Sequence, residues 1–266
     1  MSPAVRSVPF VKASACGNDF LLIDGARAPH DIADFTRRIC DRHDGVGADG
    51  VEWMLPHFSA DLEIRLINAD GSAAEISGNG TRCAAAYFCS QQGKERISVL
   101  TGAGMKMCQL VARHDSEYEF ETEMGDALVE SELALDLPAG TVRGIPVSMG
   151  NPHYVVFVPD FPADWQVLAA EIQSASHFSQ GVNVELVAIA GRHDVRVRFF
   201  ERGVGETRSS GTGSCASAAA SIAARHVDSP VNVHALGGMQ TVRKEGGKLF
   251  LRGPARLVCQ GEFFVS

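Results

Sequence analysis

Two stretches of the sequence, NADGSAAEISGNG at residues 68–80 and ERGVGETRSSGTG at residues 201–213, follow the same plan. In each, a polar residue stands nine positions before a serine, and that serine opens a Ser-Gly-x-Gly turn. The offset between them is 133 residues, and the same 133 residues separate GNDF at 17–20 from GNPH at 150–153. A constant offset without net insertion predicts two similar domains. We expect these domains to face one another, with equivalent groups on opposite sides of one cleft.

The local patterns after and between these turns predict mixed α/β structure. Ala-rich stretches at residues 81–92 and 214–227 follow the two turns, and their low charge indicates one buried helix in each half. Further helices are expected near residues 32–41 and 164–175. Alternating and β-rich segments predict strands at 20–24, 62–67, 154–158 and 195–200. The turn-rich stretch from 125 to 144 is expected to connect the two halves.

Composition excludes several classes of protein. The chain has 266 residues, 45% of them hydrophobic and 21% charged, which is typical of a soluble globular protein. A net charge of −8 leaves no basic surface for nucleic acid. No apolar stretch approaches the roughly 18–20 residues of a membrane span. The seven scattered cysteines, and an N-terminus without an export signal, lead us to expect reduced thiols in the cytoplasm.

The glycine turns are suited to bind an anion. Glycines at a helix start let backbone N–H groups point outward at the positive end of the helix dipole, where a carboxylate or phosphate binds. A single turn of this kind is more often a Ser-capped helix start. The matched pair favours a shared ligand site, and neither turn has the GxxxxGK[ST] pattern of a nucleotide loop.

Polar residues recur on loops beside the β-segments. Asn18, Asn68, Asn151 and Asn183 carry amides that suit both charged ends of a small zwitterion, although a single Asn is more often a turn residue. His153 and Glu201 lie in corresponding positions of the plan and are the titratable candidates.

At this level the chain resembles the diaminopimelate epimerase family, through GNDF, NADG, SGNGTRC, MGNPH, ERGVGET and SSGTGSC in this order and spacing. The resemblance implies an α/β fold of two pseudo-symmetric domains, each a barrel-like mixed sheet around a central helix. The expected domains are residues 1–124 and residues 125–255. In the family a terminal strand usually crosses back to the first domain, here about residues 256–266.

The resemblance also implies an activity: inversion at an amino acid's α-carbon without cofactor or metal, converting LL- to meso-diaminopimelate for lysine and cell-wall precursors. Two groups face each other across the substrate; one removes the proton and the other returns one. His153 and Glu201 match the pair of residues that, in the family, adjusts the proton affinities of these two groups. The expected partner is an amino-acid substrate, with neither nucleic acid nor membrane, and a homodimer is compatible with the family. The substrate-binding residues carried over by position are Asn18, Asn68, Gly78, Asn79, Asn151, Asn183, Arg202, Gly211 and Thr212. Gly50 stands where the family can have Gln.

The chain departs from the family at the two catalytic positions. The family has cysteines there, and this chain has Ser77 and Ser210. A thiol has a pKa of roughly 8.5, and a serine hydroxyl is several units weaker as an acid, so forming the base costs on the order of 5 kcal/mol or more. Cys83 and Cys215 lie five or six residues further along the expected helices and are expected to pack inside them.

Three explanations of the serines remain open. They are substitutions introduced to trap an inactive complex, natural residues in a homologue with other chemistry, or activated groups that epimerise slowly. In the second case, an isomerase or lyase would use a carboxylate, for which Glu201, Glu75 and Asp70 are candidates. A non-catalytic amino-acid-binding homologue is the remaining alternative.

Because backbone N–H groups carry the expected carboxylate contact, we predict that the chain binds an amino acid despite lacking the thiols. Isothermal titration calorimetry with diaminopimelate should detect this binding. The absence of both heat and a thermal-shift response, with diaminopimelate and with related amino acids, would contradict the prediction.

Overall fold

The computed structural model describes residues 6–138 and 140–265, and it divides the chain into two compact units. Unit 1 comprises Met1–Thr122 and Gly253–Ser266, and unit 2 comprises Glu123–Arg252. Residues 1–5, which belong to the expected first domain, and residue 139, in the expected connection, lie outside the described residues. The sequence-based boundaries, after residues 124 and 255, lie within a few residues of these divisions.

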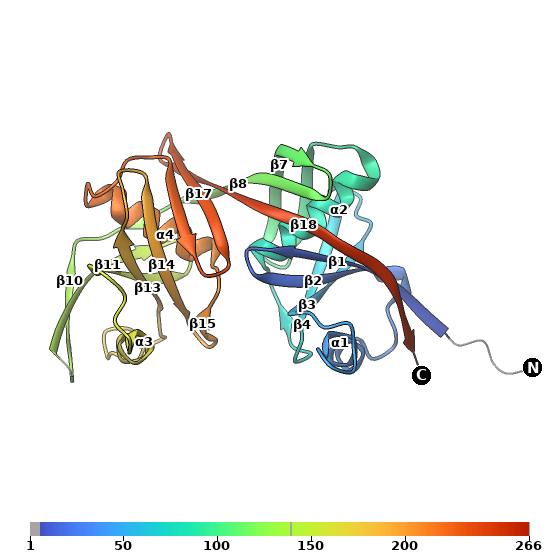
Figure 1. Ribbon diagram of the computed structural model, residues 1–266, viewed down its shortest axis with the longest axis horizontal. Coiled ribbons are helices and arrows are strands. Elements are labelled where there is room, and N and C mark those ends of the chain that lie inside the picture. Colours follow the sequence, from blue (N-terminus) through green and yellow to red (C-terminus); the bar gives the residue numbers. More distant parts are fainter. Residues whose placement is uncertain (1–5, 139, 266) are drawn as a thin grey trace, which may run out of the picture. The chain divides into compact units, whose positions relative to one another are not determined.

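Unit 1 is a ring of strands around one helix (Figure 1). The strands pair in the order β1, β2, β3, β4, β6, β7, β8, β18 and back to β1, with β2–β3 and β4–β6 parallel. The elements of this unit are β1 (Arg6–Ala15), β2 (Asn18–Asp24), the short 3₁₀ helix η1 (Gly25–Arg27), α1 (Ile32–Cys40), β3 (Gly50–Leu55), β4 (Leu62–Asn68), β5 (Ala73–Ala74), α2 (Gly78–Gln92), β6 (Arg96–Thr101), β7 (Gly104–His114) and β8 (Glu117–Asp126).

Unit 2 repeats the arrangement, with β12–β13 and β14–β16 as its parallel pairs and α4 as its central helix (Figure 1). The elements are β9 (Leu128–Val129), β10 (Leu133–Leu137), β11 (Gly140–Ser148), β12 (Pro152–Phe157), α3 (Trp165–Gln173), β13 (Asn183–Ile189), β14 (Asp194–Glu201), β15 (Gly205–Thr207), α4 (Gly211–Ala223), β16 (Val231–Ala235), β17 (Gly238–Glu245) and β18 (Lys248–Val265). Strand β18 begins in unit 2 and continues into unit 1.

The offset of 133 residues holds for whole elements. Helix α1 begins at Ile32 and α3 at Trp165, and the central helices begin at Gly78 and Gly211. The expected pseudo-symmetric α/β fold, each half a barrel-like sheet around a central helix, is confirmed.

The central helices can lie inside rings of strands because their side chains are small. In α2 the buried residues include Ala84, Ala85 and Ala86, and in α4 they include Ala216 and Ala218. Leucine and valine side chains of the surrounding strands fill the space that remains. The low charge of both Ala-rich stretches therefore does indicate burial.

Two expectations about element boundaries are wrong. The stretch from 125 to 144 is not a simple connection, because alternation in Leu133, Leu135 and Leu137 forms strand β10, which pairs with β11. Helix α4 ends at Ala223, four residues before the expected end at 227. Arg225 adopts a positive φ of 59°, which reverses the chain there.

In the described part of the chain, no helix is long and apolar enough to cross a membrane. No disulfide joins cysteines in the part of the chain that the structure describes, and six of the seven cysteines are buried.

The second glycine of each turn, Gly80 or Gly213, packs so closely that a methyl group has no room. An ideal Cβ on Gly213 would lie 2.9 Å from the Phe199 ring and 2.8 Å from Glu185 Oε1, whereas at Gly211 the nearest atom lies at 3.4 Å. We predict that Gly213→Ala lowers the free energy of unfolding by about 1–3 kcal/mol, as overpacking does, and that the matched control Gly211→Ala changes it by less than half as much. Urea denaturation measures both, and equal stabilities of the two variants would contradict the packing argument.

Candidate active site

Ser77 and Ser210 are the N-caps of the two central helices. Ser77 Oγ accepts a hydrogen bond from Gly80 N, and Ser210 Oγ accepts one from Gly213 N, both at 3.1 Å. Each serine has extended backbone angles, as an N-cap requires. The capping bond occupies a lone pair of each hydroxyl oxygen and leaves the hydroxyl proton available for donation.

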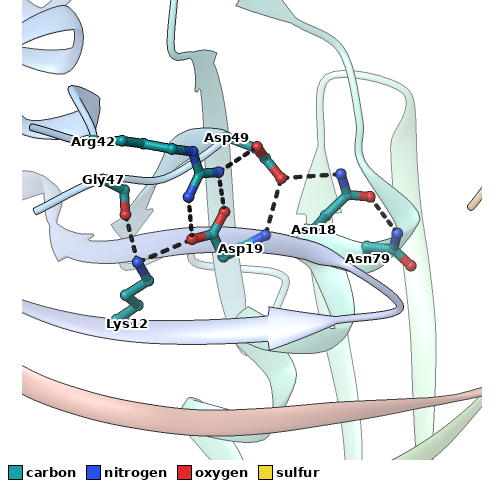
Figure 2. Close-up of polar contacts among 7 residues, drawn as sticks. All are labelled: Lys12, Asn18, Asp19, Arg42, Gly47, Asp49 and Asn79. Atoms are coloured by element: carbon teal, nitrogen blue, oxygen red, sulfur yellow. Dashed lines mark hydrogen bonds and ion pairs between the residues drawn. The ribbon is translucent and has the colours of Figure 1, made fainter. Parts of the chain in front are cut away.

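In unit 1 a chain of amides lies beside the turn (Figure 2). Asn79 Nδ2 donates to Asn18 Oδ1 at 2.6 Å, and Asn18 Nδ2 donates to Asp49 Oδ2 at 3.1 Å. Asp49 is held by Arg42, which also pairs with Asp19. The carboxylate of Asp19 keeps its charge, since hydrogen bonds from Arg42 and Lys12 outweigh its partial burial and lower its pKa. These contacts fix the orientation of both amides.

Arg82 anchors the other side of the same amide. It donates to Asn79 Oδ1 and, at 3.3 Å, to the carbonyl of Pro254. Its guanidinium also lies 3.9 Å from Cys16 Sγ. Arg82 is 2% exposed and is therefore a buried cation. Its hydrogen bond to Asn79 Oδ1 helps to fix the orientation of that amide.

Unit 2 has the equivalent amide contact. Asn151 Nδ2 lies 3.4 Å from Thr212 Oγ1, and Asn151 and Thr212 stand 133 residues after Asn18 and Asn79. Here the amide also contacts an acid–base pair. Asn151 Oδ1 lies 3.1 Å from His153 Nε2. His153 Nδ1 lies 2.7 Å from Glu185 Oε1, and His153 is 1% exposed.

Glu201 lies close enough to this pair to be influenced by its charge. Burial raises the pKa of Glu201, the Thr207 hydroxyl at 2.6 Å opposes that rise, and the nearby charge of Glu185 adds to it. Burial likewise raises the pKa of Glu185, against the effect of His153. His153 and Glu185 are therefore in direct contact, whereas Glu201 bonds to Thr207 and is linked to the pair only through their charges.

Asn183 and Arg202 form a second contact group of unit 2. Asn183 Nδ2 donates to the carbonyl of Pro152 at 2.9 Å, and Asn183 Oδ1 accepts from the backbone N–H of Arg202 at 3.0 Å. The Arg202 guanidinium is exposed and donates to the carbonyl of Gln180. In unit 1, Asn68 Nδ2 donates to Ser72 Oγ and holds its own turn.

The other carboxylates considered from the sequence are poorly placed for proton transfer. Asp70 is exposed, and hydrogen bonds from Ser72 lower its pKa, so it is a solvated carboxylate. Glu75 is also exposed. Cys83 and Cys215 are 0% exposed inside their helices, and burial raises the pKa of Cys83, so neither takes over the role of the missing thiols.

Sequence reasoning missed one pair of residues, Glu52 and Glu185. They are 133 residues apart, on β3 and β13, and both are 0% exposed. Each carboxyl lies against the second glycine of its turn, Gly80 or Gly213. The signal was available in the sequence, because a glutamate inside a β-rich segment at both ends of the 133-residue offset is a repeated buried charge.

Within the described residues no group of three His, Cys, Asp or Glu side chains is arranged to hold a metal ion.

Comparisons with solved structures support the fold. The fold is shared with a phenazine biosynthesis protein of the PhzF family from Bacillus anthracis, at 17% identity and a TM-score of 0.72 over 98% of this chain and 100% of that one. It is also shared with a hydroxyproline epimerase from Agrobacterium vitis, at 18% identity and a TM-score of 0.66 over 97% and 91%. This shared fold, together with curated relatives that are diaminopimelate epimerases, places the chain among isomerases of the epimerase type.

The diaminopimelate epimerase family model matches residues 10–129 and 145–258. Diaminopimelate epimerase of Pelotomaculum thermopropionicum is 36% identical over 96% of this chain and 98% of its own length. That of Methanothrix thermoacetophila is 39% identical over 97% and 96%. The chain belongs to the diaminopimelate epimerase family.

Glu52 gives a prediction about stability. Burial raises its pKa from 4.5 to about 8. The folded state therefore holds a proton that the unfolded state loses, and the free energy of unfolding falls as the pH rises from about 4.5 to about 8. The advantage of Glu52→Gln over the unsubstituted chain should grow across this window and then level off.

Urea denaturation at a series of pH values measures this advantage. The exposed Glu95→Gln is the matched control and should show no such window. A constant difference between Glu52→Gln and the unsubstituted chain, from pH 4.5 to pH 8, would show that Glu52 ionises normally.

Proposed function

We propose that this chain binds diaminopimelate and transfers protons at its α-carbon without a cofactor, slowly because both catalytic positions are serine. The observation that carries the proposal is the duplicated turn. Each unit has an N-cap serine, a helix N-terminus and an oriented amide pair in equivalent positions. Proton transfer on both faces of one carbon needs two such sets.

The helix N-termini supply the carboxylate contact. The capping bonds use the N–H groups of Gly80 and Gly213, so the N–H groups nearer the helix ends, those of Gly78 and Gly211, are the proposed donors to the ligand. As the α-proton leaves, negative charge develops on the carboxylate, and the same dipoles stabilise that charge. Asn18 and Asn151, whose amides are fixed by their neighbours, are proposed contacts to the ammonium and carboxylate groups.

Ser77 and Ser210 are the proposed proton carriers. To act as a base, a serine must pass its own proton to a neighbouring group as it removes the substrate's α-proton. In unit 2 the carboxyls of Glu185 and Glu201, whose pKa values burial raises, and the His153 imidazole beside Glu185 are the proposed groups that exchange this proton. The hydroxyl's high pKa keeps this step slow in comparison with a thiol.

One observation favours a second candidate function. Glu201 is half-buried and its pKa is raised, whereas Asp70 and Glu75 are exposed. If a carboxylate is the acid–base group, as in an isomerase or lyase of this fold, Glu201 is the residue proposed for the role.

Lysine and cell-wall precursor synthesis is the proposed pathway, by analogy with the relatives' printed activity. The proposed compartment is the cytoplasm, which the lack of disulfides among the described cysteines supports.

The test restores the thiols. Ser77→Cys with Ser210→Cys should raise α-proton exchange and inversion of diaminopimelate by about 10²–10⁴-fold, the usual contribution of a well-placed general base. Each single variant should do less, because inversion needs one base and one acid. NMR in deuterated water follows exchange, and chiral chromatography follows inversion and separates it from elimination.

The outcome also decides between the alternatives. A double variant that folds and binds diaminopimelate, yet neither exchanges nor inverts the α-proton, contradicts the epimerase proposal. Elimination products that disappear in Glu201→Gln would favour the lyase, and binding without any chemistry would favour the non-catalytic homologue.

A further inference from the structure

Glu52 is a carboxyl group inside the apolar core of unit 1. In the strand register it stands between Leu22 of β2 and Leu66 of β4, and both leucines belong to the core around α2. Neither of its oxygens has a hydrogen-bond partner among the residues that the structure describes. A buried polar group without a partner is costly, and a fold retains one when it serves a purpose.

The carboxyl of Glu52 lies directly beneath the first turn of α2. The point where a Cβ of Gly80 would stand is 2.0 Å from Glu52 Oε1 and 3.3 Å from Ser77 Cβ. Glu52 therefore adjoins both the capping serine and the glycine whose N–H the serine binds. This is the end of the helix at which the proposed carboxylate contact lies.

The equivalent position in unit 2 is different. Glu185 has the same relation to Gly213, but it is paired with His153 at 2.7 Å. The residue that stands in the place of His153 in unit 1 is Phe20, which belongs to the apolar core. Glu52 therefore has no imidazole with which to share a proton.

The groups around Glu52 do not favour its ionised form. From α2, Arg82 is engaged with Asn79 and Pro254, and Cys83 is a buried thiol. The inward residues of β2 and β4 are apolar, and α1 covers the opposite face of β3, where Val51 and Trp53 point. Burial alone raises the pKa of Glu52 to about 8, so the neutral acid predominates at pH 7.

We propose that Glu52 is a proton-holding positioning residue of the carboxylate site at the N-terminus of α2, and that this site binds a carboxylate while Glu52 is neutral and releases it when Glu52 ionises. The inference rests on the proposed function, since it concerns the same ligand contact. It adds a titratable group that controls that contact in unit 1 and has no counterpart in unit 2, where Glu185 is paired.

The physical reason is local electrostatics. A helix N-terminus carries a partial positive charge of about half a unit, which attracts the ligand's carboxylate. A full negative charge on Glu52, buried in a medium that screens poorly, cancels this attraction and repels the ligand. Binding is therefore linked to proton retention, and each pH unit above the pKa of Glu52 weakens binding by up to about tenfold.

The experiment measures the dissociation constant of diaminopimelate by calorimetry from pH 6 to pH 10. The unsubstituted chain should lose affinity by up to about tenfold per unit above pH 8. Glu52→Gln, which cannot ionise, should keep its affinity, and the ratio between the two chains removes the titration of the ligand's own amino groups. The surface variant Glu95→Gln should follow the unsubstituted chain.

A second variant and a direct titration guard against ambiguous results. Glu52→Leu occupies the same apolar surroundings without a carboxyl group, and this variant should also keep its affinity for diaminopimelate at high pH. Carboxyl ¹³C NMR of glutamate-labelled protein should show one resonance that titrates near pH 8 and is missing from Glu52→Gln.

The outcomes separate this proposal from the proposed function. If diaminopimelate binds at pH 7 and the loss at high pH persists in Glu52→Gln and Glu52→Leu, Glu52 does not control the contact. If binding at pH 7 shows no loss up to pH 10 in the unsubstituted chain, the proposal is likewise overturned while the binding site stands. If diaminopimelate binds at no pH, the proposed function fails and this inference fails with it.

Discussion

The hydrogen bond from the second glycine of each turn to the N-cap serine is the interaction on which the rest of the structure depends. The first N–H groups of each central helix have no partner within the helix. Ser77 and Ser210 each accept a hydrogen bond from one of them at 3.1 Å, and the glycines that donate it let the helix approach the neighbouring strand. The capped turn therefore determines where the helix starts and which N–H groups remain for a ligand.

The two units use this common frame for different chemistry. Unit 1 surrounds its turn with amides and ion pairs. Arg82 donates to Asn79, and Figure 2 shows the contacts from Asn79 through Asn18 to Asp49. Unit 2 instead places a histidine and two glutamates with raised pKa values near its turn. Equivalent positions of the common frame therefore hold amides and ion pairs in unit 1 and an imidazole–carboxylate pair in unit 2.

Much of the fold and of the candidate site could be predicted from the sequence, because equivalent motifs of the two halves are separated by a constant number of residues. The offset of 133 residues located both helix starts, and Ala content identified both central helices. The strand β10 was missed because its alternating leucines lie among turn residues, and the end of α4 depends on the backbone of Arg225. The roles of Glu52 and Glu185 needed the strand register, since only pairing shows that they face the central helices.

The central proposal is that the capped N-terminus of α2 and that of α4 both take part in binding diaminopimelate. Backbone amide NMR during a titration with diaminopimelate tests it most directly. The account predicts that the N–H resonances of Gly78 and Gly211 shift together, with the same dissociation constant and a stoichiometry of one ligand per chain. Shifts confined to one of the two turns, or different dissociation constants at the two glycines, would contradict it.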